Sequence, residues 1–386
     1  MKLRLFLTLT MVAGAGLSGC DDFKTPAASQ QSSGADPSLA PRPPAAPATP
    51  AVAQAPSAPA APAVADPSPA APASPEAQAI DAAAFAPVQT AADGRRTLIR
   101  AEVLLDRAHF SPGVIDGRNG GNFRLALATF ERARGLAGAP ASVGAGASLD
   151  AAALNALTTA DPGPVVQTYV IADDDVKGPF LGTAHQDMAA LAKLKYVGYT
   201  TPSQGLAEKF HMGEDLLRRL NPGVDFGKAG ATILVARPSS DPLPPVARIE
   251  VDKRANQVRA FDPTGRLEAA FPATVGSTER PAPSGQWAVR AVAPRPDYTY
   301  DPSRLTFGDK TQGKLTIPPG PNNPVGSTWI DLTVPTFGIH GAPDPSLVGK
   351  TASHGCVRLT NWDAAALGKA VKKGVPVIFE GVTSKH

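Results

Sequence analysis

Several kinds of residue are scarce in this 386-residue chain, and the scarcities exclude whole classes of protein. Charged residues make up only 18% of it and the formal net charge is +3, so the sequence predicts no nucleic-acid partner. No run of about 18 apolar residues follows the N-terminal segment, which excludes a multi-pass membrane protein. Aromatic residues account for 6%, whereas 41 Pro and 36 Gly indicate that much of the chain lies outside a packed core. Length and composition together predict several domains rather than one globule.

Cysteine is scarcer still, because only Cys20 and Cys356 are present. Cys20 follows a basic start and a short apolar run, the pattern of a secretory signal. Leu17-Ser18-Gly19-Cys20 resembles the lipobox of bacterial lipoproteins, which implies a signal peptide over residues 1–19 and an acylated Cys20 at the mature N-terminus. Acyl chains would hold the protein on a membrane surface. An ordinary cleaved signal with an incidental cysteine is the alternative.

Acylation of Cys20 would leave Cys356 without a partner for an intramolecular disulfide. A lone thiol exported into an oxidising compartment is uncommon unless its sulfur reacts. Cys356 is therefore a candidate nucleophile, and a buried, inert cysteine is the alternative.

Residues 20–90 are predicted to form a disordered tether behind the lipid anchor. Ala supplies 18 and Pro 14 of the 50 residues from 26 to 75, a composition that cannot bury a core and favours extended polyproline conformations. Such a tether would let a membrane-held protein work well away from the bilayer.

Residues 91–160 are predicted to form a small helical domain. Apolar residues recur at helical spacing from Leu98, and a second helix is expected to end near Gly135. The stretch His109 to Leu136 resembles the small helical peptidoglycan-binding domain that is often fused to cell-wall enzymes. This resemblance implies glycan binding, and a plain helical spacer is the alternative.

Residues 165–238 are predicted to form an α+β domain. A strand is expected at Tyr169, followed later by a helix around Leu206, an Asn221-Pro222-Gly223 turn and a closing strand at Ile233. The second part resembles the back half of a LysM glycan-binding module, although the link between the halves is unusually long. A plain α+β packing domain is the alternative.

Residues 246–382 change to short, β-branched strands between Gly, Pro, Asn and Asp turns, which predicts a mostly β domain. One helix is expected there, with Asn361 as its N-cap and Gly374 at its end.

The residues with evident chemistry lie in this last domain. Phe337-Gly338-Ile339-His340-Gly341 is followed after a loop by Ser353-His354-Gly355-Cys356-Val357-Arg358. A cysteine attacks as thiolate, and a nearby imidazole generates one by accepting its proton. His340 ends an apolar stretch and is the expected base; His354 is the competing candidate, although a tight turn would point its side chain away. Gly355 permits a sharp turn, and the backbone N–H groups of residues 354–356 could converge on an oxyanion.

These motifs closely resemble the catalytic signature of the L,D-transpeptidase (YkuD-type) family, including the sixteen-residue step from His340 to Cys356. The segment Pro318 to Gly326 also resembles a proline-rich loop of its Gram-negative branch. The resemblance implies a β-sandwich with one helix, preceded here by the helical and LysM-like domains. It implies the following roles: Cys356 as nucleophile, His340 as base, the Gly341 carbonyl orienting the imidazole, Ser353, His354 and Gly355 shaping the nucleophile turn, and Arg358 positioning a substrate carboxylate. A structural salt bridge is the alternative role for Arg358.

By this resemblance the reaction is acyl transfer on peptidoglycan stem peptides, with release of a terminal D-alanine and formation of 3-3 cross-links or a lipoprotein anchor. No metal site and no cofactor are expected. The expected partners are stem peptides, wall glycan and, through Cys20, a membrane; the oligomeric state stays open. The expected location is the bacterial cell envelope, facing the periplasm, on either the inner or the outer membrane. A cysteine hydrolase of wall links and a non-catalytic wall-binding lipoprotein are the alternatives.

Overall fold

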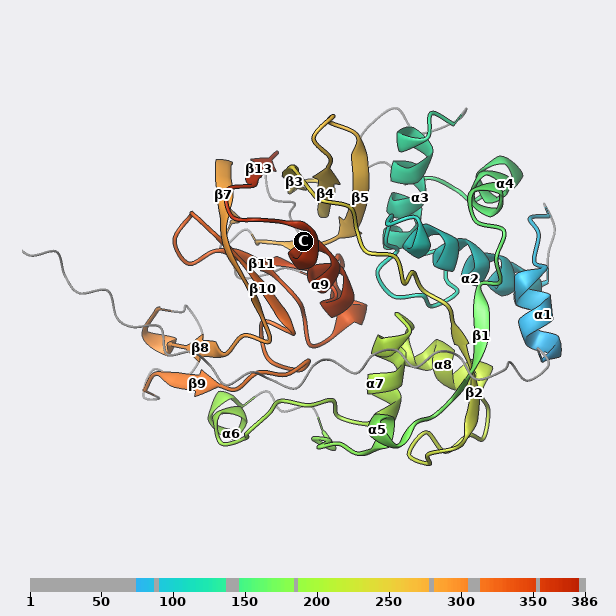
Figure 1. The fold of residues 1–386 in the computed structure, drawn as a ribbon, viewed down its shortest axis with the longest axis horizontal. Helices are drawn as coiled ribbons and strands as arrows, with labels where there is room; N and C mark the ends of the chain where they lie inside the picture. The colour runs from blue at the N-terminus through green and yellow to red at the C-terminus, as the bar shows by residue number, and fades with distance from the viewer. Residues whose placement is uncertain are drawn as a thin grey trace, which may run out of the picture. The chain divides into compact units, whose positions relative to one another are not determined.

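The computed structural model describes residues 74–86, 90–136, 146–183, 187–277, 281–304, 313–351 and 355–381. Cys20 and the predicted tether up to residue 73 lie outside these ranges, as do Ser353 and His354. The prediction of disorder over residues 20–90 is wrong for its last part, because Pro75–Asp81 form a helix whose Ile80 is fully buried in the core. Within them, a largely helical part is followed by a β-rich part (Figure 1). No helix in these ranges is both long and apolar enough to cross a membrane.

The first part, up to residue 236, begins with helices whose ends are defined by side-chain caps. Thr90 accepts a hydrogen bond from Asp93 N, and Asp150 accepts one from Ala153 N, so each satisfies a backbone donor at a helix start. The elements in chain order are α1 (Pro75–Asp81), α2 (Ala91–Arg107), α3 (Gly121–Ala133), α4 (Ala151–Ala160), β1 (Val166–Val170), α5 (Asp173–Val176), α6 (Met188–Ala192), α7 (Pro202–Lys209), α8 (Glu214–Leu220) and β2 (Thr232–Ala236).

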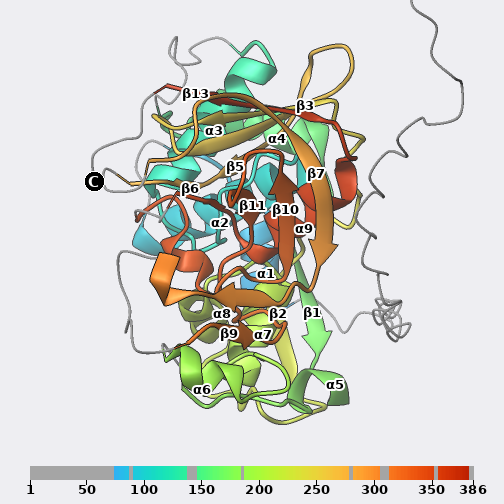
Figure 2. The same cartoon turned by 90° about the vertical axis from the view of Figure 1, so that its left-hand side faces the viewer.

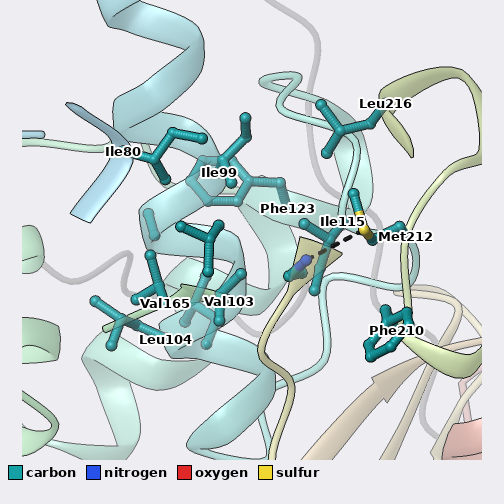
Figure 3. Packing of buried hydrophobic residues seen from close by; sticks show 14 of the residues in the cluster. Ile80, Ile99, Val103, Leu104, Ile115, Phe123, Val165, Phe210, Met212 and Leu216 are labelled. Carbon is teal, nitrogen blue, oxygen red and sulfur yellow. Dashed lines mark hydrogen bonds between the residues drawn. The ribbon is translucent and has the colours of Figure 1, made fainter. Parts of the chain in front are cut away.

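The regions 91–160 and 165–238 share one hydrophobic core. The strands β1 and β2 pair in antiparallel fashion, with α7 and α8 between them in sequence. Figure 3 shows part of the shared cluster, in which residues 80–123 pack against residues 165–216: Ile80, Ile99, Val103, Leu104, Ile115, Phe123, Val165, Phe210, Met212 and Leu216. Because apolar area from both regions is buried in the same cluster, the two regions stabilise each other.

The second part contains a single nine-stranded sheet in the order β5-β4-β3-β13-β7-β10-β11-β12-β6. Its strands are β3 (Arg248–Asp252), β4 (Gln257–Phe261), β5 (Leu267–Pro272), β6 (Thr274–Val275), β7 (Gly285–Pro294), β10 (Thr328–Leu332), β11 (Gly338–His340), β12 (Val357–Arg358) and β13 (Pro376–Glu380). The pairs β3–β13 and β11–β12 are parallel and the others are antiparallel.

This sheet curls into a nearly closed barrel. Its first and last strands, β5 and β6, are separated in sequence by Ala273 alone. The two ends of the strand order are therefore held together by the chain itself. The predicted β-rich character is confirmed, but the predicted sandwich of two sheets is replaced by one continuous, curled sheet.

A small hairpin of β8 (Tyr298–Tyr300) and β9 (Leu315–Ile317) lies beside this sheet and contacts α6 (Figures 1 and 2). Leu191 on α6 is buried with Tyr300 and Ile317 of the hairpin in a separate apolar cluster. The long link between β1 and α7 thus contributes α6 as a support for the hairpin.

The helix α9 (Asn361–Ala370) packs against β10 (Figure 1). Its N-cap is Thr360, whose Oγ1 accepts a hydrogen bond from Asp363 N at 3.1 Å. The predicted cap at Asn361 and the predicted end at Gly374 are both wrong. Asn361 is the first helical residue, and its side chain is occupied by other partners.

Candidate active site

The parallel pairing of β11 with β12 brings the segment that contains His340 next to the segment that follows Cys356. Ile339 pairs with Val357 and His340 pairs with Arg358, while Leu359 N donates to the His340 carbonyl at 2.8 Å. Paired residues project to one side and alternate residues share a face. Cys356 directly precedes β12, so this pairing brings its backbone next to β11, and Ile339 and Val357 are buried in the core.

Cys356 stands at the start of β12 and is partly buried. Its Sγ lies 4.0 Å from the carbonyl oxygen of Thr336, to which the thiol donates. Gly355, directly before it, has a φ of +106°, a conformation that a residue with a Cβ rarely adopts. The predicted sharp turn at Gly355 is thus present, while Ser353 and His354 lie outside the described residues.

The His340 imidazole is held in one tautomer. Its Nδ1 lies 2.7 Å from the carbonyl oxygen of Gly341. A carbonyl only accepts hydrogen bonds, so Nδ1 carries the proton and donates it, and Nε2 keeps a lone pair. The ring also stacks on Trp329, with centroids 5.3 Å apart and planes 22° apart.

The protonation state of His340 follows from its surroundings. Only 3% of this residue is exposed, and burial lowers the pKa of its imidazole to about 4, with the positive charge of Arg358 acting in the same direction. The hydrogen bond to Gly341 opposes this shift. At neutral pH the imidazole is therefore uncharged and able to accept a proton through Nε2.

Arg358 adds a fixed positive charge beside this pair. Burial lowers the pKa of its guanidinium, and the charges of Cys356 and Tyr298 act against that shift. The guanidinium is thus close enough to the sulfur for their charges to interact. It would stabilise a thiolate at Cys356, while it disfavours a second positive charge on His340.

The loop after His340 is packed against Asn361 at the start of α9. A Cβ at Gly341 or at Gly326 would overlap Asn361 Oδ1, so both positions require glycine for lack of space. The Gly341 N–H donates to Thr328 O at 3.1 Å, and Ser327 N donates to Asn361 Oδ1 at 2.9 Å. The carbonyl that orients His340 is therefore fixed by a dense, hydrogen-bonded contact.

Reasoning from the sequence missed three residues of this site. Trp329 and Asn361 were not assigned to it, and neither was Glu208, which contacts Asn361 from α7. Trp329 lies two strands from the motif cysteine, and Glu208 is 153 residues before Asn361. The local sequence around Asn361 indicated only the start of a helix, and nothing in it pointed to a contact with the site. Among the residues the structure describes, no group of three or more His, Cys, Asp or Glu side chains is placed to hold a metal ion.

Comparison with known proteins agrees with this geometry. Residues 246–379 match the family model of the YkuD L,D-transpeptidase catalytic domain. A Bacillus licheniformis protein that carries the name L,D-transpeptidase YkuD is 26% identical over 179 residues, which cover 45% of this chain and 90% of that protein. An Escherichia coli protein that carries the name L,D-transpeptidase YbiS is 28% identical over 189 residues, which cover 47% of this chain and 61% of that protein.

Among solved structures, an L,D-transpeptidase from Mycobacterium smegmatis aligns with a TM-score of 0.29 and 21% identity. The alignment covers 40% of this chain and 65% of that one. The β-rich C-terminal region thus matches the model of the L,D-transpeptidase catalytic domain, and more than half of the chain lies outside each of these similarities.

Proposed function

We propose that the protein is a peptidoglycan L,D-transpeptidase with Cys356 as nucleophile and His340 as general base. The observation that carries the proposal is the tautomer of His340. Its Nδ1–H is bound to the Gly341 carbonyl, which leaves Nε2 as a proton acceptor on the strand that pairs with β12, directly after Cys356. Nucleophile, base and the group that orients the base are the parts that covalent acyl transfer requires.

In the first half-reaction, His340 Nε2 accepts the thiol proton and Cys356 Sγ attacks the carbonyl carbon of the third residue of a tetrapeptide stem. The oxyanion that forms accepts hydrogen bonds from backbone N–H groups of the turn at residues 354–356. The intermediate then collapses, and the bond to the terminal D-alanine breaks. The amino group of the departing D-alanine takes the proton from His340, and a thioester on Cys356 remains.

In the second half-reaction, an amine replaces the leaving group. It attacks the thioester carbonyl, gives up a proton through His340, and releases Cys356 as thiol. A diaminopimelate side chain as acceptor yields a 3-3 cross-link, and a lysine of a wall-bound lipoprotein yields an anchored protein. Water as acceptor would make the same site a hydrolase.

Arg358 contributes charge rather than a proton in this scheme. With the pKa of His340 near 4, the imidazole is uncharged at neutral pH and can accept the thiol proton. The guanidinium stabilises negative charge on the sulfur as the proton leaves, and its remaining donors suit a substrate carboxylate. Arg358 thus assists the thiolate only as it forms.

The remaining regions are proposed to bring the catalytic domain to its substrate. Residues 91–160, which resemble a peptidoglycan-binding domain, and residues 165–238, which resemble a LysM module, would bind glycan. An acyl chain on Cys20 would hold the protein on a membrane at the periplasmic side of the envelope. The part of the predicted tether that precedes α1 would give it reach across the wall.

The decisive experiment is incubation of the protein with disaccharide-tetrapeptide, followed by mass spectrometry of both protein and products. A transpeptidase forms a covalent adduct on the peptide containing Cys356 and yields dimeric muropeptide. Shortened monomer without dimer would identify a hydrolase. Absence of adduct and product, with Cys356→Ala indistinguishable from wild type, would leave only a wall-binding protein.

A further inference from the structure

A side chain from the region before residue 246 contacts the catalytic domain beside the site. Glu208, on α7, lies behind the site, and its Oε1 accepts a hydrogen bond from Asn361 Nδ2 at 3.0 Å. The same Nδ2 donates to the Pro321 carbonyl at 3.1 Å, while Ser327 N donates to Oδ1 at 2.9 Å. The orientation of the Asn361 amide is thus defined by partners on both of its ends.

The position of the Glu208 carboxyl lowers the stability of the fold. The side chain of Glu208 is partly buried, and this burial raises the pKa of its carboxyl to about 7. Oε1 also accepts from the Tyr199 hydroxyl at 3.2 Å, but Oε2 is buried and has no hydrogen-bond partner among the described residues. A buried carboxyl with one oxygen unsatisfied destabilises the fold. A function for its position is therefore a better explanation than stability.

We propose that Glu208 is a positioning residue for His340 and acts through Asn361 and Gly341. The inference rests on the proposed function, because it assumes that His340 is the base for Cys356. It makes the region before residue 246 part of the catalytic apparatus, in addition to any part it has in binding the wall.

The linkage runs through three contacts. Glu208 fixes the Asn361 amide, and Asn361 Oδ1 occupies the space where a side chain at Gly341 would otherwise lie. The Gly341 carbonyl in turn accepts the Nδ1 proton of His340. Without Glu208 the Asn361 amide keeps Pro321 O and Ser327 N as partners but loses one of its three hydrogen bonds, so its contact beside Gly341 is held less firmly. His340 can then carry its proton on Nε2, where it cannot act as a base.

The surrounding interface keeps Glu208 in place. The side-chain amides of Gln204 and Asn322 bond each other in both directions at 3.1 Å. Val197 N donates to Pro319 O at 2.9 Å, and Asn322 N donates to Val197 O at 3.2 Å. The loop from Pro318 to Gly326 is thus docked on the same region that supplies Glu208, so the carboxyl is prepositioned before substrate arrives.

Alkylation of Cys356 by iodoacetamide tests the inference without wall chemistry. The rate is followed in the full chain by mass spectrometry of the peptide that contains Cys356. Glu208→Leu should slow alkylation by roughly tenfold, the scale of losses when a group supporting a site ligand is removed. Glu208→Gln should stay close to wild type because its amide oxygen still accepts from Asn361. Glu214→Leu, which alters a glutamate on α8 bonded to Ser203 and Arg218, is the matched control and should alkylate normally.

A double-mutant cycle distinguishes positioning from general loosening. Asn361→Ala alone and together with Glu208→Leu should give the same rate, because both changes break one linkage. Additive losses would overturn the inference, as would a wild-type rate in Glu208→Leu. Asn361→Asp keeps the shape of the side chain but replaces the Nδ2 donor with an oxygen that cannot donate to Glu208. Its alkylation should also be slow, and this variant replaces Glu208→Leu in the test if that variant does not fold. His340→Ala is the reference: if it alkylates like wild type, the proposed function itself fails.

Discussion

Replacement of Gly341 by alanine is the most direct test of the packing that orients His340. A Cβ at this position would overlap Asn361 Oδ1 and lie 3.2 Å from Asn361 Cγ and 3.3 Å from its Cα. The carboxamide oxygen would have to retreat by more than an ångström to reach ordinary van der Waals contact, or the His340–Gly341 backbone would have to move instead. Overpacking of this kind costs about 1–3 kcal/mol of stability.

The catalytic loss should exceed the loss of stability. A displacement of about 1 Å in a positioned group can lower a rate by about 100-fold. We therefore expect Gly341→Ala to remain folded and to acylate Cys356 with tetrapeptide about 100-fold more slowly, as measured by intact-mass time courses. Thermal unfolding measures the stability cost in the same preparations.

The matched control is Gly121→Ala at the start of α3. A Cβ there would meet nothing within 4 Å, so its stability should equal or exceed that of wild type and its acylation rate should not change. Wild-type acylation by Gly341→Ala, with an unfolding temperature like that of the control, would refute the role given to this contact.

Four further outcomes are expected. Because the pKa of His340 is near 4, the rate of Cys356 alkylation should not fall as the pH is lowered through 6.5. A fall near pH 6.5 that disappears in His340→Ala would contradict a buried, neutral imidazole. Trp329→Ala should expose the His340 imidazole to solvent and raise its pKa towards the ordinary value. An NMR titration of the His340 imidazole measures this rise, and the pH at which alkylation slows should rise with it. The raised pKa of Glu208 means that the folded state binds more protons between about pH 4 and 7, so its stability falls as pH rises through that window. The free energy of unfolding of Glu208→Gln, relative to that of wild type, should therefore be up to about 3 kcal/mol higher at pH 8 than at pH 4. Chemical denaturation at both pH values measures this, and the same difference between variant and wild type at both would contradict it. Shortening residues 26–75 should impair function in cells but leave the rate in solution unchanged, and equal loss in both would sink the tether hypothesis.

The proximity in the chain of the two candidate residues, His340 and Cys356, was evident from the sequence because their motifs are local. The sixteen-residue step from His340 to Cys356 connects β11 with the turn before β12, and the motif places Gly355, with its φ of +106°, in that turn. A short β-rich domain with one helix was likewise predictable from strand composition and turn residues.

The supports of the pair were not predictable, because they depend on contacts between distant segments. Thr360 and Asn361 are both good N-cap residues, and only the position of Gly341 and Glu208 decides which side chain caps the helix. Strand composition does not give strand order, so the closure of the sheet through Ala273 was also out of reach.

The place of β13 in the sheet has a consequence for how the catalytic domain is assembled. Although it is the last strand in sequence, it lies in the interior of the strand order, between β3 and β7. Ile249 near the start of the domain pairs with Val377, so the two halves of the sheet remain unjoined until the final strand has been synthesised and inserted. Contacts this distant in sequence slow folding. A truncation that removes residues 376–380 would thus split the sheet at its centre rather than trim its edge, and the cysteine would lose the frame that aligns it with its base.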